Sequence, residues 1–145
     1  MENFVEAAFE EEKKEQAAET RVTRRPFAVW EVGGETYRMK LTTADIQELE
    51  QRYKTNLVNI MTTDDDTGLP ALSVMLDVAQ QAMQKYHHGI TRAKVMSLFD
   101  AYVEEGGSQS EFFMNVYTDI FRVSGFFSRA RVEKMERLMK DAEEA

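Results

Sequence analysis

The sequence predicts a mainly helical α+β fold, in which an N-terminal β-hairpin packs on a bundle of about five helices. Two observations predict it. First, two apolar and β-branched runs flank Gly33-Gly34, and a two-residue Gly-Gly loop favours a hairpin because its turn needs positive φ. Second, apolar residues after residue 42 recur at the three- and four-residue spacing of amphipathic helices.

The hairpin loop also sets the register of the two strands, which we expect over residues 27–32 and 35–41. The predicted cross-strand pairs are Val32 with Glu35, Trp30 with Tyr37, and Ala28 with Met39. Trp30 and Tyr37 then share a largely apolar face. Because a lone hairpin is marginal in water, we expect Trp30 to anchor this face on a helix, and the helix that follows is the nearest candidate.

Most predicted helices begin at a recognisable signal. Thr42 and Asp45 are spaced as a capping box, with Asp in place of the usual Glu or Gln. Thr91 and the Ser108–Glu111 box are further capping signals. The predicted helices cover residues 42–54, a turn or two from Leu57, a segment from Leu69-Pro70 to about His88 with Gly89 just past its end, one from Thr91 to about Glu104, one from Ser108 through Phe121, and a last one from about Ser128.

Composition suggests three segments along the chain. Residues 1–25 form a charged arm rich in Ala, Glu and Lys, which is either a short amphipathic helix or a disordered acidic arm. Residues 26–127 form the hairpin and helical domain. Residues 128–145 form a C-terminal amphipathic helix with a thin apolar stripe. This helix and the hairpin edge are two surfaces open to pairing, so we expect a homo-oligomer.

Charge and composition disfavour several classes of function. The chain has 145 residues, a formal net charge of −8 and no cysteine. Nucleic-acid binding needs clustered Lys and Arg, so the negative charge argues against it. No apolar run is long enough to cross a membrane, and the N-terminus lacks the pattern of a secretory signal. We therefore expect a cytoplasmic protein without disulfides.

The sequence contains no recognisable catalytic or cofactor-binding motif. The only two histidines, His87 and His88, are adjacent, so they point about 100° apart on a helix and chelate poorly; we interpret them as capping or surface residues. The consecutive Asp64, Asp65 and Asp66 lack the alternating ligands of a calcium loop. We expect no enzyme activity, no metal and no cofactor.

Aromatic side chains are densest between Phe112 and Phe127. Their spacing fits either a helical core or a surface left open for a partner. Nine methionines allow the same two interpretations, because Met fills irregular cores and also adapts to variable apolar partners. The candidate partner-binding residues are Phe112, Phe113, Tyr117 and Phe121, then Phe126, Phe127 and Met135. The candidate structural residues are Trp30, Gly33, Gly34 and Tyr37.

The run W-E-V-G-G-E-T-Y-R-M-K-L-T-T-A-D-I-Q-E-L-E, Trp30 to Glu50, resembles the opening of phage tail assembly chaperones. That family is encoded between the tail-tube and tape-measure genes of siphophage-like modules, prophages and gene-transfer particles. The resemblance extends more loosely through Phe126-Phe127. The arm at 1–20 and the last helix lie outside it, and the charged arm departs from the family pattern.

The resemblance implies a helper of tail morphogenesis in the host cytoplasm that keeps the tape-measure protein soluble and is absent from the mature virion. It also implies a possible longer form made by ribosomal frameshifting. Three other classes remain open: a structural tail component such as a completion or adaptor protein, a small regulatory or interaction protein, and an enzyme whose site has no local signature.

Overall fold

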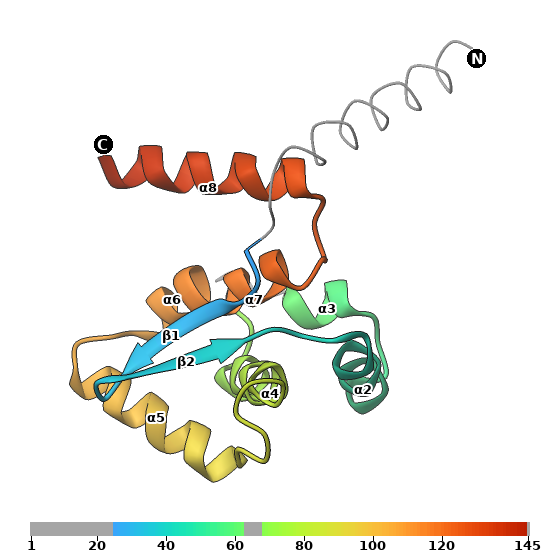
Figure 1. Ribbon diagram of the computed structural model, residues 1–145, viewed down its shortest axis with the longest axis vertical. Helices are drawn as coiled ribbons and strands as arrows, with labels where there is room; N and C mark the ends of the chain where they lie inside the picture. Colours follow the sequence, from blue (N-terminus) through green and yellow to red (C-terminus); the bar gives the residue numbers. More distant parts are fainter. Residues whose placement is uncertain (1–24, 63–67, 145) are drawn as a thin grey trace. The chain divides into compact units, whose positions relative to one another are not determined.

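The computed structural model describes residues 25–62 and 68–144, and it confirms the α+β fold class (Figure 1). Two compact units are present: Pro26–Ser124, and a second that includes Arg25 and residues 125–144. The strands are β1 (Ala28–Val32) and β2 (Glu35–Met39). The helical segments are α2 (Thr43–Tyr53), α3 (Leu57–Met61), α4 (Leu72–Met83), α5 (Arg92–Glu104), α6 (Gln109–Phe112), η1 (Phe113–Tyr117), α7 (Thr118–Val123) and α8 (Arg129–Glu144).

The hairpin has the predicted register, with Trp30 opposite Tyr37 and the other two pairs as expected. Gly33 and Gly34 adopt φ of 62° and 76°, so both occupy the left-handed region that favours glycine. The Gly33 amide donates a hydrogen bond of 2.7 Å to Oε1 of Glu105, at the end of α5. The turn is therefore fixed to a helix as well as to its own strands.

Trp30 is the anchor of the ribbon, as predicted, but its partners are not those expected. Its side chain is 1% exposed. The ring lies edge-on to Phe112 of α6 and Tyr102 of α5, with centroid distances of 5.0 and 5.7 Å. The prediction that α2 covers this face was wrong. Only residues 40–42 connect β2 to α2, too few for that helix to fold back beneath the strands, and α2 packs on α3 and α4 instead.

Three of the predicted helix starts are confirmed by side-chain caps. Thr42 and Asp45 form the complete capping box of α2, and Asp45 also accepts a 2.7 Å hydrogen bond from Nε2 of Gln81 in α4. Thr91 accepts from the Lys94 amide at the start of α5. At α6 only the serine half of the predicted box is present, in which Ser108 accepts from the Glu111 amide.

The limits of α4 differ from the prediction. The helix begins at Leu72, after a buried Pro70, because Ala71 is extended with ψ of 144°. It ends at Met83, before the expected end near His88. Beyond that point the chain turns away through Gly89, whose φ is 82°. The His87 amide returns to the Met83 carbonyl at 2.7 Å, so this turn replaces the final turn of the helix.

The helix predicted from Ser108 onward contains a π-helical turn that the sequence pattern did not indicate. In η1 the Thr118 amide donates to the Phe113 carbonyl five residues earlier, and the Thr118 hydroxyl donates to the same oxygen at 2.7 Å. A π turn widens the helix by one residue and rotates the next helical turn about the axis. Every residue of α7 from Asp119 to Val123 is buried as a result.

Two buried polar contacts stabilise this region. The Tyr117 hydroxyl donates a 2.9 Å hydrogen bond to the Ile60 carbonyl, at the end of α3. Asp119 and Arg122 form an ion pair with Nε–Oδ1 of 3.0 Å, and their side chains are 8% and 4% exposed. Arg122 is therefore enclosed in the first unit, where its charge faces that of Asp119.

The second unit contains α8, which begins at Arg129, close to the predicted start. Ser128 accepts a hydrogen bond of 3.2 Å from the Arg131 amide. Arg25 forms an ion pair with Glu136 at 3.0 Å, with both side chains well exposed. The two interpretations of the arm at 1–25 concern residues that, apart from Arg25, lie outside the described part of the chain.

Replacing Trp30 tests the anchor. We expect Trp30→Ala to lower the free energy of unfolding by about 3–5 kcal/mol, measured by urea denaturation, because it leaves a large cavity. Trp30→Phe should cost clearly less, since Nε1 of Trp30 is buried without a hydrogen-bond partner among the described residues and its loss removes that penalty. Thr36→Ala, on the opposite face, is the control. An unchanged stability for Trp30→Ala would contradict the packed ribbon.

Removing the Tyr117 hydroxyl tests the link to α3. Tyr117→Phe should cost about 1–3 kcal/mol, because the buried Ile60 carbonyl loses its donor. Tyr102→Phe is the matched control, since its hydroxyl has no hydrogen bond within the described residues. Burial raises the pKa of Tyr117 above its ordinary 10.0. In the wild type, the stabilisation of the fold by the protonated Tyr117 hydroxyl is therefore complete below pH 10 and is lost as the pH rises further. Equal losses of stability in Tyr117→Phe and Tyr102→Phe would contradict the role of the Tyr117 hydroxyl in holding α3.

Candidate functional site

Three of the four leading aromatic candidates lie in the core. Phe112, Tyr117 and Phe121 are each 0% exposed. Phe112 contacts Trp30 and Phe99, while Tyr117 packs edge-on against Phe121 at 5.1 Å. The expectation that these three residues are uncovered on the later helices is therefore corrected. Phe112 is enclosed by the hairpin and α5, whereas Tyr117 packs on Phe121 and reaches α3 through its hydroxyl.

Phe113 is the member of this group that reaches the surface. It is half-buried and its ring stacks on Tyr117, with centroids 5.9 Å apart and planes 28° apart. Next to it on η1, Met114 is 56% exposed. One aromatic ring and one thioether are thus presented outward at the π turn. This pair remains accessible to a partner.

The second-choice candidates belong to the second unit. Phe126 and Phe127 are half-buried and pack edge-on against each other, with centroids 4.6 Å apart. The side chain of Met135 lies outside the described ones, although its backbone is in α8. Leu138, one turn further, is 59% exposed. The role of these residues in partner binding stays a prediction.

Two further apolar residues, outside the candidates predicted from the sequence, are exposed in the structure. On α5, Met96 and Val103 are 53% and 47% exposed. They are seven residues apart, so they lie on one face of that helix. The buried face of α5 carries Val95, Leu98 and Phe99, so Val103 lies outside it. The exposure of Met96 and Val103 was hard to predict, because an apolar residue in a helical sequence fits both a buried and an exposed position.

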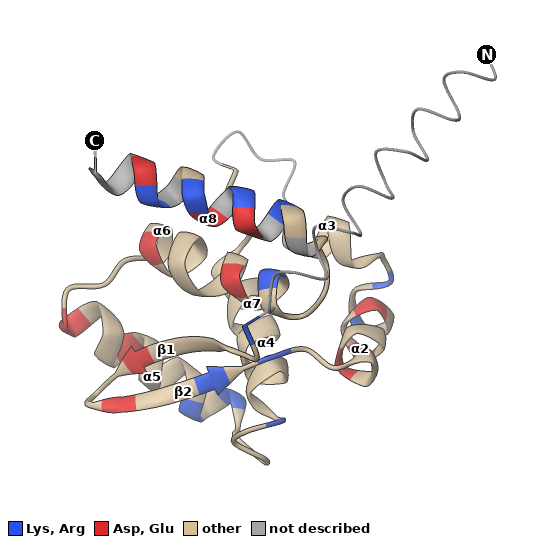
Figure 2. Cartoon of the chain, turned by 45° about the horizontal axis from the view of Figure 1, so that its top comes forward, with Lys and Arg blue, Asp and Glu red and all other residues tan. Residues whose placement is uncertain are grey.

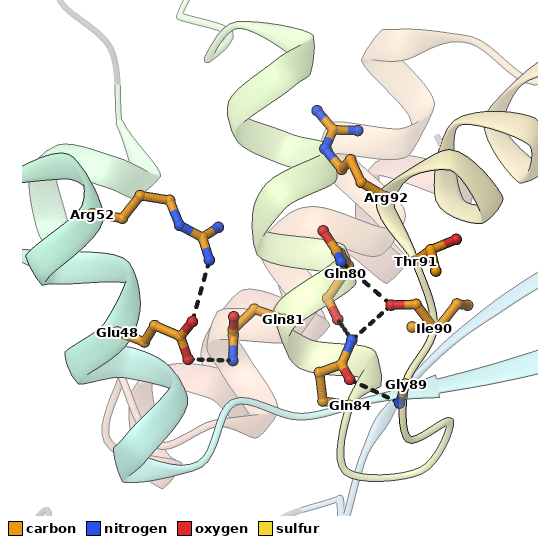
Figure 3. A pocket seen from close by; sticks show the side chains of 9 residues that line it. All are labelled: Glu48, Arg52, Gln80, Gln81, Gln84, Gly89, Ile90, Thr91 and Arg92. Atoms are coloured by element: carbon orange, nitrogen blue, oxygen red, sulfur yellow. Dashed lines mark hydrogen bonds and ion pairs between the residues drawn. The ribbon is translucent and has the colours of Figure 1, made fainter.

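A polar pocket of about 490 Å³ lies between α2, α4 and the loop that leads into α5 (Figure 3). In the loop, Gln84 accepts from the Gly89 amide and donates to the Ile90 carbonyl, each at 3.0 Å. On the α2 side, Glu48 accepts from Arg52 at 3.4 Å and from Gln81 at 3.3 Å. The pocket is lined by Glu48, Arg52, Gln80, Gln81, Gln84, Gly89, Ile90, Thr91 and Arg92.

Arg92 joins the pocket wall to a network across three helices. Its Nε donates to Oδ1 of Asp77 at 2.7 Å and its Nη2 to the Ser73 carbonyl at 3.1 Å. Tyr53 of α2 donates to the other oxygen of Asp77. Burial, reinforced by that hydrogen bond, raises the pKa of Tyr53 to about 12. These contacts fix the junction of α2, α4 and α5, while Nη1 of Arg92 is buried without a hydrogen-bond partner among the described residues.

His87 has a structural partner that the capping interpretation did not include. Its Nε2 accepts a 2.9 Å hydrogen bond from the Arg38 amide, on the outer edge of β2. Its ring is tilted against Tyr37, with centroids 5.2 Å apart. His88 is exposed. His87 therefore belongs to the contact between the hairpin and the loop after α4.

The pocket lining contains no histidine, and its one carboxylate, Glu48, is paired with Arg52. Within residues 25–62 and 68–144, no group of three or more acidic or histidine side chains is placed to hold a metal ion. Asp64, Asp65 and Asp66 lie outside the described residues. Among the described helices, none is long and apolar enough to cross a membrane.

Comparison with known proteins yields a family model that matches residues 24–145. No curated protein and no solved structure matches the chain. The matched range includes the whole hairpin and helical unit as well as α8. The chain therefore belongs to DUF6096, a family of unknown function.

Proposed function

We propose that the protein is a phage tail assembly chaperone that binds helical segments of a tape-measure protein. The proposal rests on the segment from Trp30 to Glu50, whose sequence resembles the opening of phage tail assembly chaperones. This segment folds as a Gly-Gly hairpin followed by a helix with a Thr42–Asp45 capping box. The proposal places the protein in the host cytoplasm, as a non-enzymatic factor that is absent from the finished particle.

The contact surface in this proposal consists of the apolar side chains that the fold leaves exposed. Met96 and Val103 on α5, together with Phe113 and Met114 at the π turn, are the candidates in the first unit. Methionine adapts its shape to different apolar partners. A long helical client offers anchors at every third, fourth and seventh position. Repeated weak contacts along one client then add through avidity, so a single contact need not be strong.

Coexpression with the tape-measure protein encoded beside it tests this function. We expect the tape-measure protein to be soluble with the chaperone and insoluble without it. The double variant Met96→Ser/Met114→Ser should reduce the soluble fraction several-fold while remaining folded, because both side chains are exposed. The matched control is Val58→Ser, a residue 50% exposed on α3, a helix that Figure 1 places away from α5.

Two outcomes would contradict the proposal. One is a tape-measure protein that is soluble alone; the other is one that stays insoluble beside abundant folded wild-type protein. Recovery of the chain in purified tail particles would favour a structural tail component instead. Equal effects of the double variant and the Val58→Ser control would reject the contact surface but not the chaperone function.

A further inference from the structure

The two edges of the hairpin are not equivalent. In this register, Val32, Trp30 and Ala28 exchange hydrogen bonds with β2, so the backbone groups of Val29 and Glu31 point to the outer edge of β1. The corresponding outward residues of β2 are Thr36 and Arg38, followed by Lys40. A two-stranded ribbon therefore presents two outer edges.

The outer edge of β2 is closed by the chain itself. The Arg38 amide donates to Nε2 of His87, and the Lys40 amide donates to the Ala82 carbonyl, both at 2.9 Å. Ala82 lies in the last turn of α4 and His87 in the loop that follows. No further strand can pair along β2 without displacing these contacts.

Within the described part of the chain, the outer edge of β1 is open. The amides of Val29 and Glu31 make no hydrogen bond with any described residue. Their side chains are exposed and alternate with the buried Ala28, Trp30 and Val32, so the helices cover only the inner face of the strand. Open strand edges with regular backbone are templates for pairing with another strand.

We propose that β1 binds β1 of a second copy of this chain, antiparallel and about a two-fold axis at Val29. The hairpins of the two copies then form one four-stranded sheet in the order β2-β1-β1-β2. Val29 faces its counterpart across the axis, and Phe27 of each copy faces Glu31 of the other. The outward amides and carbonyls of these residues pair with one another, which satisfies the open edge.

Charge favours a second copy in this orientation. Acidic Glu31 and Glu35 lie toward the turn, whereas basic Arg38 and Lys40 lie toward the other end of the ribbon (Figure 2). The Arg38 guanidinium lies over the Phe27 ring, with Cζ 4.9 Å from the centroid. Glu31 of the second copy, opposite Phe27, is thereby brought next to Arg38. A parallel arrangement would instead place Glu31 beside Glu31.

The contact also removes exposed apolar surface. Val29 is 36% exposed, and pairing covers it with an identical side chain. The turn that ends the strand is already fixed by the bond from Gly33 to Glu105. The edge is therefore held in an extended conformation before it pairs, which lowers the entropic cost of association.

Sedimentation velocity of the full-length protein over a wide concentration range tests the proposal. We expect a concentration-dependent dimer. Val29→Lys should weaken it at least about tenfold, because two like charges then face each other across the axis. Thr36→Lys makes the same charge change on the same face of the ribbon but on β2, and should leave the dimer intact. Circular dichroism and melting temperature verify that both variants are folded.

Disulfide cross-linking provides a second test that does not depend on charge. The chain has no cysteine, so any disulfide reports the introduced site. Val29→Cys should form a covalent dimer under mild oxidation, because facing hydrogen-bonded residues have Cα atoms about 5.5 Å apart, within disulfide range. Thr36→Cys should not, since its counterpart lies three strand spacings away, at least about 14 Å.

The proposal is overturned if the wild-type protein stays monomeric at every concentration. It is also overturned if Val29→Lys leaves the dimer unchanged, or if Thr36→Cys cross-links as readily as Val29→Cys. Either of the last two results would place the interface elsewhere on the chain. The chaperone proposal does not depend on this interface and is tested separately.

Discussion

The burial of Trp30 is the contact on which the first unit depends. A two-stranded ribbon has too little area to be stable alone, and Trp30 connects it to Tyr102 of α5 and Phe112 of α6. Phe99 packs against both of those rings, with centroids 5.9 Å from Tyr102 and 5.5 Å from Phe112. Gly107 lies beneath Tyr102, where a Cβ would come within 2.4 Å of the ring. The hairpin and the later helices therefore share one aromatic core.

That core also determines which surfaces remain for function. Because Phe112, Tyr117 and Phe121 are used to hold the hairpin and α3, they cannot serve as an external groove in this fold. The exposed apolar groups of the first unit include two flexible ones, Met96 and Met114, together with the valines Val29, Val58 and Val103. Binding through such groups favours broad and repeated contacts over one deep pocket, which is the requirement for shielding a long helical client.

Several features could be predicted from the sequence because each depends on residues a few positions apart. They are the hairpin register, the Gly33-Gly34 turn, the caps at Thr42 and Thr91, and the fold class. A turn needs φ that glycine tolerates, and a cap needs an oxygen three residues before an amide. The start of α4 was missed even at this local level: Ala71 is extended after Pro70, so the first turn lies beyond the proline. The π turn at η1 also has no distinctive local pattern.

Only the tertiary structure decided which aromatic residues are core, which helices cover the hairpin, and which strand edge is open. Phe112 and Phe113 are adjacent and chemically identical, yet one is wholly buried and the other half-exposed. The difference arises from Trp30, more than 80 residues earlier in the chain. His87 likewise closes the β2 edge from a distant loop. Sequence spacing specifies the faces of each element, but burial depends on which face meets another, and that is settled only when distant segments pack together.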